Sequence, residues 1–476
     1  MNGAPLTAED AALLYAEAPG TQLQIGALCF FEAGPLRDRR GRLRIEVLRT
    51  HVQARLAGLP RFRQRIAPVF ADLATPVWVD DAGFDITRHV RHVELPAPGG
   101  SAALRAVVAR LLSEPMDLAH PLWDLHVVEG VDRLTMRGGD PVDAVAVVVR
   151  AHHVMADGIA LHAAATLLLD PRPLRPRSRP LSGWSAHPTP GIIDLTARSV
   201  LERTRRQARA IAGVARIVVD PRSIPANLRL AARSAAAIGR GPRAIAPALP
   251  FTGPIGRRRA FAWASIPMAD VVAVKRSCGV TVNDVVLAIA TGAVRRQMDA
   301  TGSFDPAARE PRALVPIGDP GSTSSLGNRF SMTTVALPVG VEDLSERVGL
   351  IHARMAGHAT SPAGSAMSHV FSIVDFVPPP AIRAVAPRLL AHQPLVNLAV
   401  SNIPGSRAPL YLWESRMLGL HPFIDVVGNV ALIVGVLSYV DDLGIGVTVD
   451  PDVAGDPGTV ADHLQAAAAE LTAELA

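Results

Sequence analysis

Two adjacent histidines and an aspartate lie close enough in this chain to perform acid–base chemistry. The residues from His152 to Gly158 read HHVMADG, which is the pattern HHxxxDG. A neutral imidazole near pH 7 is the usual acceptor for a hydroxyl proton. In an extended chain, adjacent side chains point to opposite faces, so one histidine can reach a cleft while the other packs beneath it. Asp157 can hold the local loop, and Gly158 permits a backbone that larger residues would strain.

The flanking residues predict a strand before this pattern and a helix after it. The run from Ala144 to Val149 is apolar and rich in valine, which is typical of a buried strand. After Gly158, apolar side chains recur at helical spacing, at Ile159, Leu161, Ala164, Leu167 and Leu168. The histidines would therefore lie where a strand ends, as functional groups of open α/β sheets often do. The structural alternative is that Asp157 caps the helix and the histidines are ordinary packed groups.

Other chemistries have less support in the sequence. A His-x-x-x-Asp pair offers two metal ligands, whereas zinc needs at least a third, so we expect no metal. The chain lacks Gly-x-Ser-x-Gly and a Walker motif, and Gly444-Ile445-Gly446 lacks the third glycine of a dinucleotide loop, so we expect no cofactor. A histidine base without a side-chain nucleophile suits a hydroxyl that attacks an activated acyl group such as a thioester. A separate donor must then stabilise the oxyanion.

Composition is that of a globular protein of two or three domains. The chain has 476 residues, of which 49% are hydrophobic and 19% are charged. Its formal charge of +5 comes almost entirely from arginine, since Lys275 is the single lysine. This preference for arginine indicates a genome rich in G and C rather than a nucleic-acid-binding face, so we expect no nucleic-acid partner. A net positive charge of this size also suits an anionic substrate or a membrane surface.

We expect the protein to be cytoplasmic, with any association with a membrane or lipid inclusion being peripheral. Cys29 and Cys278 are far apart and cannot form a disulfide framework. The N-terminal segment contains Glu9 and Asp10 and lacks the basic region of a signal peptide. No uncharged apolar run reaches the roughly 18–20 residues that a membrane span requires.

The order of predicted elements indicates two α/β sandwich lobes with a cleft between them. Strands and helices alternate in both halves of the chain. Prolines and arginines crowd the segment from Pro171 to Pro190, and Ile192 to Arg243 is helical and rich in arginine. That helix is a solvated connection, a membrane-surface helix or a partner-binding face. We therefore divide the chain into an N-terminal lobe (1–180), a linker (181–250) and a C-terminal lobe (251–476).

Several motifs together resemble the bacterial wax ester synthase/diacylglycerol acyltransferase family, which is similar to the coenzyme-A-dependent acyltransferase superfamily. The HHxxxDG pattern is the first of these motifs. Pro121-Leu122-Trp123, the pair Asn283-Asp284 and the run from Ser401 to Gly405 follow in the family's order. The similarity extends over nearly the whole chain, although HHxxxDG alone also occurs in peptide-forming condensation domains. The chain departs from the family between Gly130 and Asp143, which is longer here, and from His421 to Gly435.

The resemblance implies two acyltransferase-like lobes, an acyl-CoA co-substrate, and diacylglycerol or a long-chain alcohol as acceptor. It assigns the catalytic base to His153, with His152, Asp157 and Gly158 shaping the loop. Asn283 and Asp284 would support the site from the second lobe, Asn283 as an oxyanion or substrate contact. The alternative for this pair is a plain helix N-terminus, capped by one of the two side chains.

Two other functions remain open from the sequence. One is a condensation-type acyltransferase that acts on another acceptor. The other is a catalytically weak lipid-binding paralogue that retains the fold.

Overall fold

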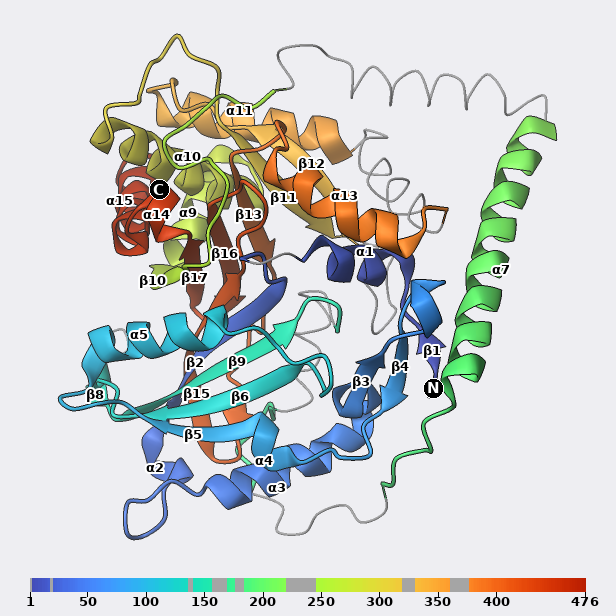
Figure 1. The fold of residues 1–476 in the computed structure, drawn as a ribbon. Coiled ribbons are helices and arrows are strands. Elements are labelled where there is room, and N and C mark those ends of the chain that lie inside the picture. The colour runs from blue at the N-terminus through green and yellow to red at the C-terminus, as the bar shows by residue number, and fades with distance from the viewer. Residues whose placement is uncertain are drawn as a thin grey trace.

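The computed structural model describes residues 2–17, 20–135, 140–155, 169–175, 184–219, 245–318, 330–359 and 376–476. Asp157, Gly158 and the helix expected after them lie outside these residues. Two six-stranded sheets form the framework, together with smaller sheets of three strands and two strands (Figure 1). The smaller sheets consist of β1 (Ala4–Pro5), β3 (Gln64–Ala67) and β4 (Val77–Asp80), and of β7 (Leu134–Thr135) and β8 (Pro141–Val142).

The first large sheet contains the strand that precedes the histidine pair. In spatial order its strands are β14 (Tyr411–Leu412), β15 (Ser415–Ile424), β2 (Gln24–Glu32), β9 (Ala144–His152), β6 (Trp123–Glu129) and β5 (Val90–Glu94). Alternate side chains of β9 enter two separate core clusters, so the strand is buried on both faces and its sequence is a continuous apolar run. Helix α5 (Gly100–Ser113) packs on one face of this sheet, and α3 (Ile45–Arg55) packs on the other.

The second large sheet forms the core of the C-terminal half. Its strands lie in the order β10 (Ala260–Pro267), β17 (Asp442–Val449), β16 (Leu432–Tyr439), β13 (Leu398–Ile403), β11 (Arg312–Gly318) and β12 (Phe330–Ala336). Four helices pack against it: α9 (Met268–Cys278), α10 (Val282–Ala300), α11 (Leu344–Ala359) and α15 (Pro457–Leu475). The other α-helices within the described residues are α1 (Ala8–Ala16), α2 (Ala33–Leu36), α4 (Ile86–His89), α7 (Ile192–Val219), α13 (Pro379–Ala391) and α14 (Pro451–Ala454).

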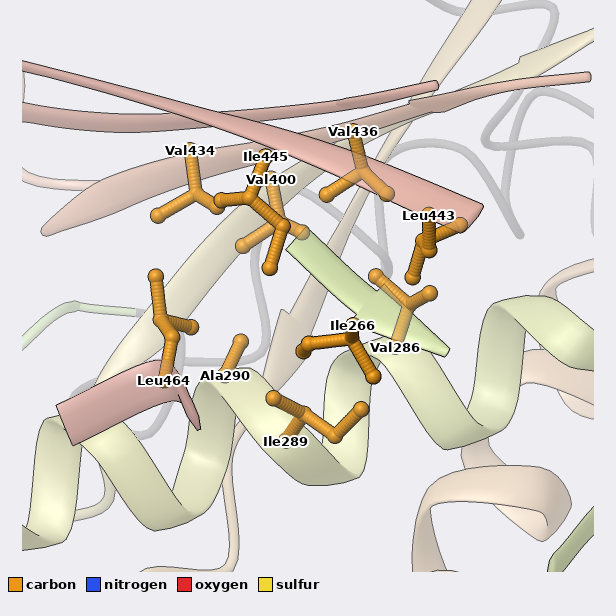
Figure 2. Close-up of a pocket in the computed structure, with 10 residues that line it drawn as sticks. All are labelled: Ile266, Val286, Ile289, Ala290, Val400, Val434, Val436, Leu443, Ile445 and Leu464. Atoms are coloured by element: carbon orange, nitrogen blue, oxygen red, sulfur yellow. The ribbon is translucent and has the colours of Figure 1, made fainter. Parts of the chain in front are cut away.

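A small apolar cavity lies between this sheet and its helices. Figure 2 shows the ten apolar side chains that line it, from β10, β13, β16, β17, α10 and α15. Its volume is about 10 Å³. A cavity needs roughly 10–15 Å³ to hold one water molecule. It is therefore a packing gap in the core rather than a substrate site.

Strand β15 joins the two halves, because it pairs with β2 in the first sheet while it packs across the second. Its register aligns Leu420 with Cys29 and Ile424 with Ile25. Gly444 and Gly446 of β17 permit this crossing, since a Cβ atom at either position would lie 1.8 Å from a backbone oxygen of β15. The Gly-Ile-Gly sequence thus has a structural cause: it lets two strands cross in direct contact.

The segment before β5 forms a short helix, α4, and the chain becomes extended only at Val90. The reason is a local cap, since the Asp85 side chain accepts a hydrogen bond from the Thr87 amide. The expected helix from Ile192 to Arg243 is described only as far as Val219, as α7.

Within the described ranges, no single helix has both the length and the apolar character that a membrane crossing needs. Helices α9 and α10 pass that test only as a pair, and they meet at an angle of 105°.

Candidate active site

The His152–His153 pair lies where β9 ends in the middle of the first sheet. His152 is the last residue of the strand and lies opposite Gln24 of β2, while His153 begins a turn. Both backbone amides are held by neighbouring segments: His152 N–H donates to Leu122 O (2.9 Å) and His153 N–H donates to Leu23 O (2.8 Å). The strand end that the sequence predicted is therefore fixed from both sides.

The His152 side chain is buried and supports the turn. Its Nδ1 accepts a hydrogen bond from the Val154 amide (3.1 Å), so the ring proton resides on Nε2. That nitrogen lies 2.9 Å from a carboxylate oxygen of Glu17, just beyond the end of α1. The same Glu17 oxygen accepts the amide of Leu23 (3.0 Å). Glu17 therefore joins His152 to the segment that holds the backbone of His153.

His153 is partly exposed, unlike His152. Burial within the protein lowers the pKa of its imidazole to about 4, and the neighbouring His152 acts in the same direction. The ring is consequently neutral near pH 7, which is the protonation state that a general base requires.

Asn283 and Asp284 lie in the first turn of α10 and make different contacts. Thr281 is the N-cap, and its side chain forms a capping box with Asp284. Asp284 is buried and also accepts a hydrogen bond from Nδ1 of His352 on α11 (2.8 Å). Its contacts are therefore those of a capping and packing residue.

Asn283 contacts another of the family-like motifs. Its side-chain oxygen lies 3.4 Å from the amide nitrogen of Asn402, on β13. The Asn283-Asp284 and Ser401–Gly405 segments, far apart in sequence, thus meet in the second lobe. This pairing turns the amide oxygen of Asn283 toward Asn402 and leaves its two amide protons for other acceptors.

The Pro121-Leu122-Trp123 segment packs beneath the histidine turn. The Trp123 ring is buried, donates to Phe62 O (2.7 Å) and stacks on His89, with ring centroids 4.7 Å apart. Because Leu122 O accepts the amide of His152, this segment shapes the end of β9 through packing and its backbone.

Three contacts of this site were not predicted from the sequence: those of Glu17, His352 and Asn402. Glu17 is 135 residues from His152, and no local pattern links them. Asn402 lies within the motif from Ser401 to Gly405, so that motif was the available signal.

One group of described residues has the geometry to hold a metal ion: His92, Glu94 and Glu129, on β5 and β6. Glu129 already pairs with Arg37 (3.0 Å) and with His92 (2.8 Å). These contacts satisfy its carboxylate with protein donors, and the group is separate from the histidine turn in the sheet.

The chain is similar to known proteins over almost its whole length. Residues 6–286 match the model of the wax ester synthase/diacylglycerol acyltransferase catalytic domain, and residues 326–472 match that of the WS/DGAT C-terminal domain. A putative diacylglycerol O-acyltransferase of Mycobacterium tuberculosis (strain CDC 1551 / Oshkosh) is 30% identical, over 98% of this chain and 89% of that protein. The probable diacylglycerol O-acyltransferase tgs1 of M. tuberculosis (strain ATCC 25618 / H37Rv) is 32% identical, over 98% and 96%.

Solved structures share the fold. The wax ester synthase/diacylglycerol acyltransferase from Marinobacter aquaeolei VT8 has a TM-score of 0.63 at 24% identity, covering 98% of both chains. The first condensation domain of the calcium-dependent antibiotic synthetase has a TM-score of 0.62 at 15% identity, covering 99% of this chain and 96% of that one. These similarities confirm the predicted α/β fold with two acyltransferase-like lobes.

Proposed function

Because this chain belongs to the wax ester synthase/diacylglycerol acyltransferase family and is therefore an acyltransferase, we propose that it esterifies an alcohol with the acyl group of acyl-CoA, using His153 as general base. The acceptor is diacylglycerol, giving triacylglycerol, or a long-chain alcohol, giving a wax ester. The thioester of acyl-CoA is already activated, so the reaction needs acyl-CoA as co-substrate and no further cofactor.

The proposed reaction has two steps. Neutral His153 takes the proton of the acceptor hydroxyl while its oxygen attacks the thioester carbonyl, forming a C–O bond and a tetrahedral oxyanion. The oxyanion then collapses, the C–S bond breaks, and the imidazolium returns its proton to the departing thiolate. The products are one ester and one free coenzyme A thiol.

The observation that carries this proposal is the difference between the two histidines. Both nitrogens of His152 have protein partners, Glu17 and the Val154 amide, so its ring is committed to holding the turn. His153 is partly exposed and neutral, and its backbone is fixed by Leu23. A positioned, neutral imidazole is what a general base requires.

We assign the oxyanion contact to the second lobe, with Asn283 as its donor. Preorganised amide donors stabilise the charge that develops in acyl transfer. Asn283 follows the N-cap of α10, where backbone N–H groups also favour negative charge, and Asn402 orients its side chain. Asp284 supports this helix end by capping it.

Thiol release by the purified protein tests the proposed function. A long-chain acyl-CoA is supplied with hexadecanol, with diacylglycerol, with a long-chain amine or without acceptor. Our proposal predicts thiol release that depends on an alcohol acceptor. Transfer to the amine alone would favour a condensation-type enzyme, whereas lipid binding without thiol release would favour a non-catalytic paralogue.

We further propose that the protein works from the cytoplasm at a membrane or lipid-inclusion surface, with the outer side of α7 as the contact. The inner side of α7 packs beside the three-stranded sheet of β1, β4 and β3 through Leu195 and Ser199, and both residues are buried. On the outer side, Ile193 is 82% exposed and Leu201 is 51% exposed. Phe70, 61% exposed, lies beside them and shares a shallow groove, which supplies an aromatic group that the sequence of the helix lacks. Apolar side chains flanked by arginines are typical of helices that lie on membranes.

The double substitution Ile193→Ser with Leu201→Ser is expected to reduce flotation with anionic phospholipid vesicles at least about fivefold, because each inserted CH₂ contributes roughly 0.8 kcal/mol. Reversing the exposed charges of Arg205 and Arg209 to glutamate should weaken binding to anionic vesicles and leave zwitterionic vesicles unaffected. Leu118→Ser, at an exposed apolar residue on another segment, is the control. Wild-type flotation by the Ile193/Leu201 variant would contradict this assignment.

A further inference from the structure

We infer that Arg259, at the start of the second lobe, is a positioning residue that fixes the His152–His153 turn through Asp425 and the segment from Gly20 to Gln24. The inference rests on the proposed role of His153 and extends it. It gives the second lobe a direct mechanical connection to the base in the first lobe.

The first step is the environment of Arg259, which precedes β10. Its side chain is only 3% exposed, and its Nε lies 2.6 Å from Asp425 Oδ1. One terminal nitrogen donates to Gly256 O (3.0 Å), and the other donates to Gly20 O. A buried guanidinium with this many partners has a fixed position, because all three of its nitrogens donate hydrogen bonds.

The second step is Asp425, which follows β15. Its amide donates to Gln24 O (3.1 Å), and Gln24 lies opposite His152 in the sheet register. Burial raises the pKa of Asp425 to about 7, against the lowering effect of Arg259. Arg259 is therefore the group that opposes the effect of burial and favours the charged form of this carboxylate. The charge of Glu17 also raises the pKa of Asp425, so the two carboxylates are electrostatic neighbours.

The third step is the close approach of the two lobes at Gly20. Its φ of +95° favours glycine, and a Cβ atom there would lie 2.7 Å from Gly256 O. The amide of Gly256 is itself held by Asp450, which follows β17 of the second sheet (2.5 Å). The Gly20–Gln24 segment is thus clamped against the second lobe at one end.

The other end of the same segment holds the histidines. Leu23 accepts the amide of His153 and donates its own amide to Glu17, which holds His152. A chain of polar contacts therefore runs from Arg259 through Gly20–Gln24 to the histidine turn. Release of Arg259 should loosen this segment and let His153 move from the acceptor hydroxyl, without removing any group that contacts substrate.

The test compares Arg259→Gln with Arg258→Gln. Arg258 is the matched control, because it is the adjacent arginine and its ion pair with Asp452 is exposed. In Arg259→Gln we expect kcat for alcohol acylation to fall about 10- to 100-fold, the cost of a small misplacement of a catalytic group, while KM for acyl-CoA is unchanged. Amide hydrogen exchange of peptides covering residues 20–25 and 150–155 should accelerate about tenfold. Arg258→Gln should match the wild type in both measurements.

Asp425→Asn and Arg259→Lys complete the design. Asp425→Asn retains shape and loses the ion pair, so it should reproduce the exchange change even if Arg259→Gln does not fold. Arg259→Lys keeps the positive charge but replaces the planar guanidinium with a single ammonium group. Its kcat should therefore lie between those of Arg259→Gln and the wild type. A folded Arg259→Gln or Asp425→Asn protein with wild-type exchange at residues 150–155 would overturn the inference. Exchange is measured without substrate, so it tests this coupling even if the wild type transfers no acyl group.

Discussion

Replacement of His153 by alanine is expected to lower alcohol-dependent thiol release by at least about 100-fold, the usual contribution of a positioned general base. The loss should fall on kcat, because alanine removes the proton acceptor and leaves the residues that fix the turn in place. His152, Glu17 and Leu23 hold that turn through contacts that do not use the His153 side chain. The measurement is the steady-state rate of thiol release with acyl-CoA and hexadecanol or diacylglycerol.

His392→Ala is the control for His153→Ala, since His392 is exposed at the end of α13. Its rate should equal that of the wild type. If the His153→Ala protein, folded by circular dichroism, retained the wild-type rate, His153 would have no part in proton transfer.

The second large effect concerns stability and involves a buried ion pair next to the site. Arg150, two residues before His152, donates from two nitrogens to the two carboxylate oxygens of Asp124, at 2.7 Å each. Burial alone would raise the pKa of Asp124, but hydrogen bonds from His126 and Arg150 hold it below its ordinary value. Asp124→Asn would leave a buried guanidinium without its counter-charge and should lower the free energy of unfolding by about 3–5 kcal/mol.

Two further variants, compared by chemical denaturation, show whether the loss of stability comes from leaving a buried charge without its partner. Substituting both partners, as Asp124→Leu with Arg150→Met, should recover much of the loss, because apolar pairs of similar volume often replace buried ion pairs at little cost. Glu114→Gln breaks the exposed pair with Arg110 and should change the free energy of unfolding by less than about 1 kcal/mol. An Asp124→Asn protein as stable as Glu114→Gln would show that the buried pair contributes nothing.

Local patterns predicted the elements of this fold better than their long-range pairing. The apolar run of β9 and the start of α10 follow from periodicity and capping, which act over a few residues. The pairing of β15 with β2 does not follow from such local patterns. The two strands are almost 400 residues apart, and the alternation of side chains along a strand does not identify its partner strand. The contribution of residues 411–424 to the first sheet was for that reason not predicted.

The candidate site shows the same difference between local motifs, which the sequence reveals, and long-range contacts, which it does not. The histidine pair and Asn283-Asp284 carry short motifs, so their positions at element ends could be predicted from the sequence. Glu17 reaches His152 across 135 residues, and Arg259 reaches Asp425 across 166. Such contacts depend on how the two sheets pack, which no local pattern specifies. The glycines of β17 illustrate this: the sequence showed an incomplete nucleotide motif, whereas the structure shows that they admit a crossing strand.

The pH dependence of kcat/KM for the alcohol tests the central claim most directly, because this ratio reports the protonation of the free enzyme. The pKa of His153 is about 4, below the ordinary 6.5, so the base is neutral and active above pH 4 and is lost as pH falls through that value. The predicted profile is flat from about pH 8 to pH 5, declines near pH 4 while circular dichroism still shows folded protein, and has no such decline in the residual rate of His153→Ala. An acid limb centred near pH 6.5, or one that persists in His153→Ala, would contradict a partly exposed but neutral His153 as the catalytic base.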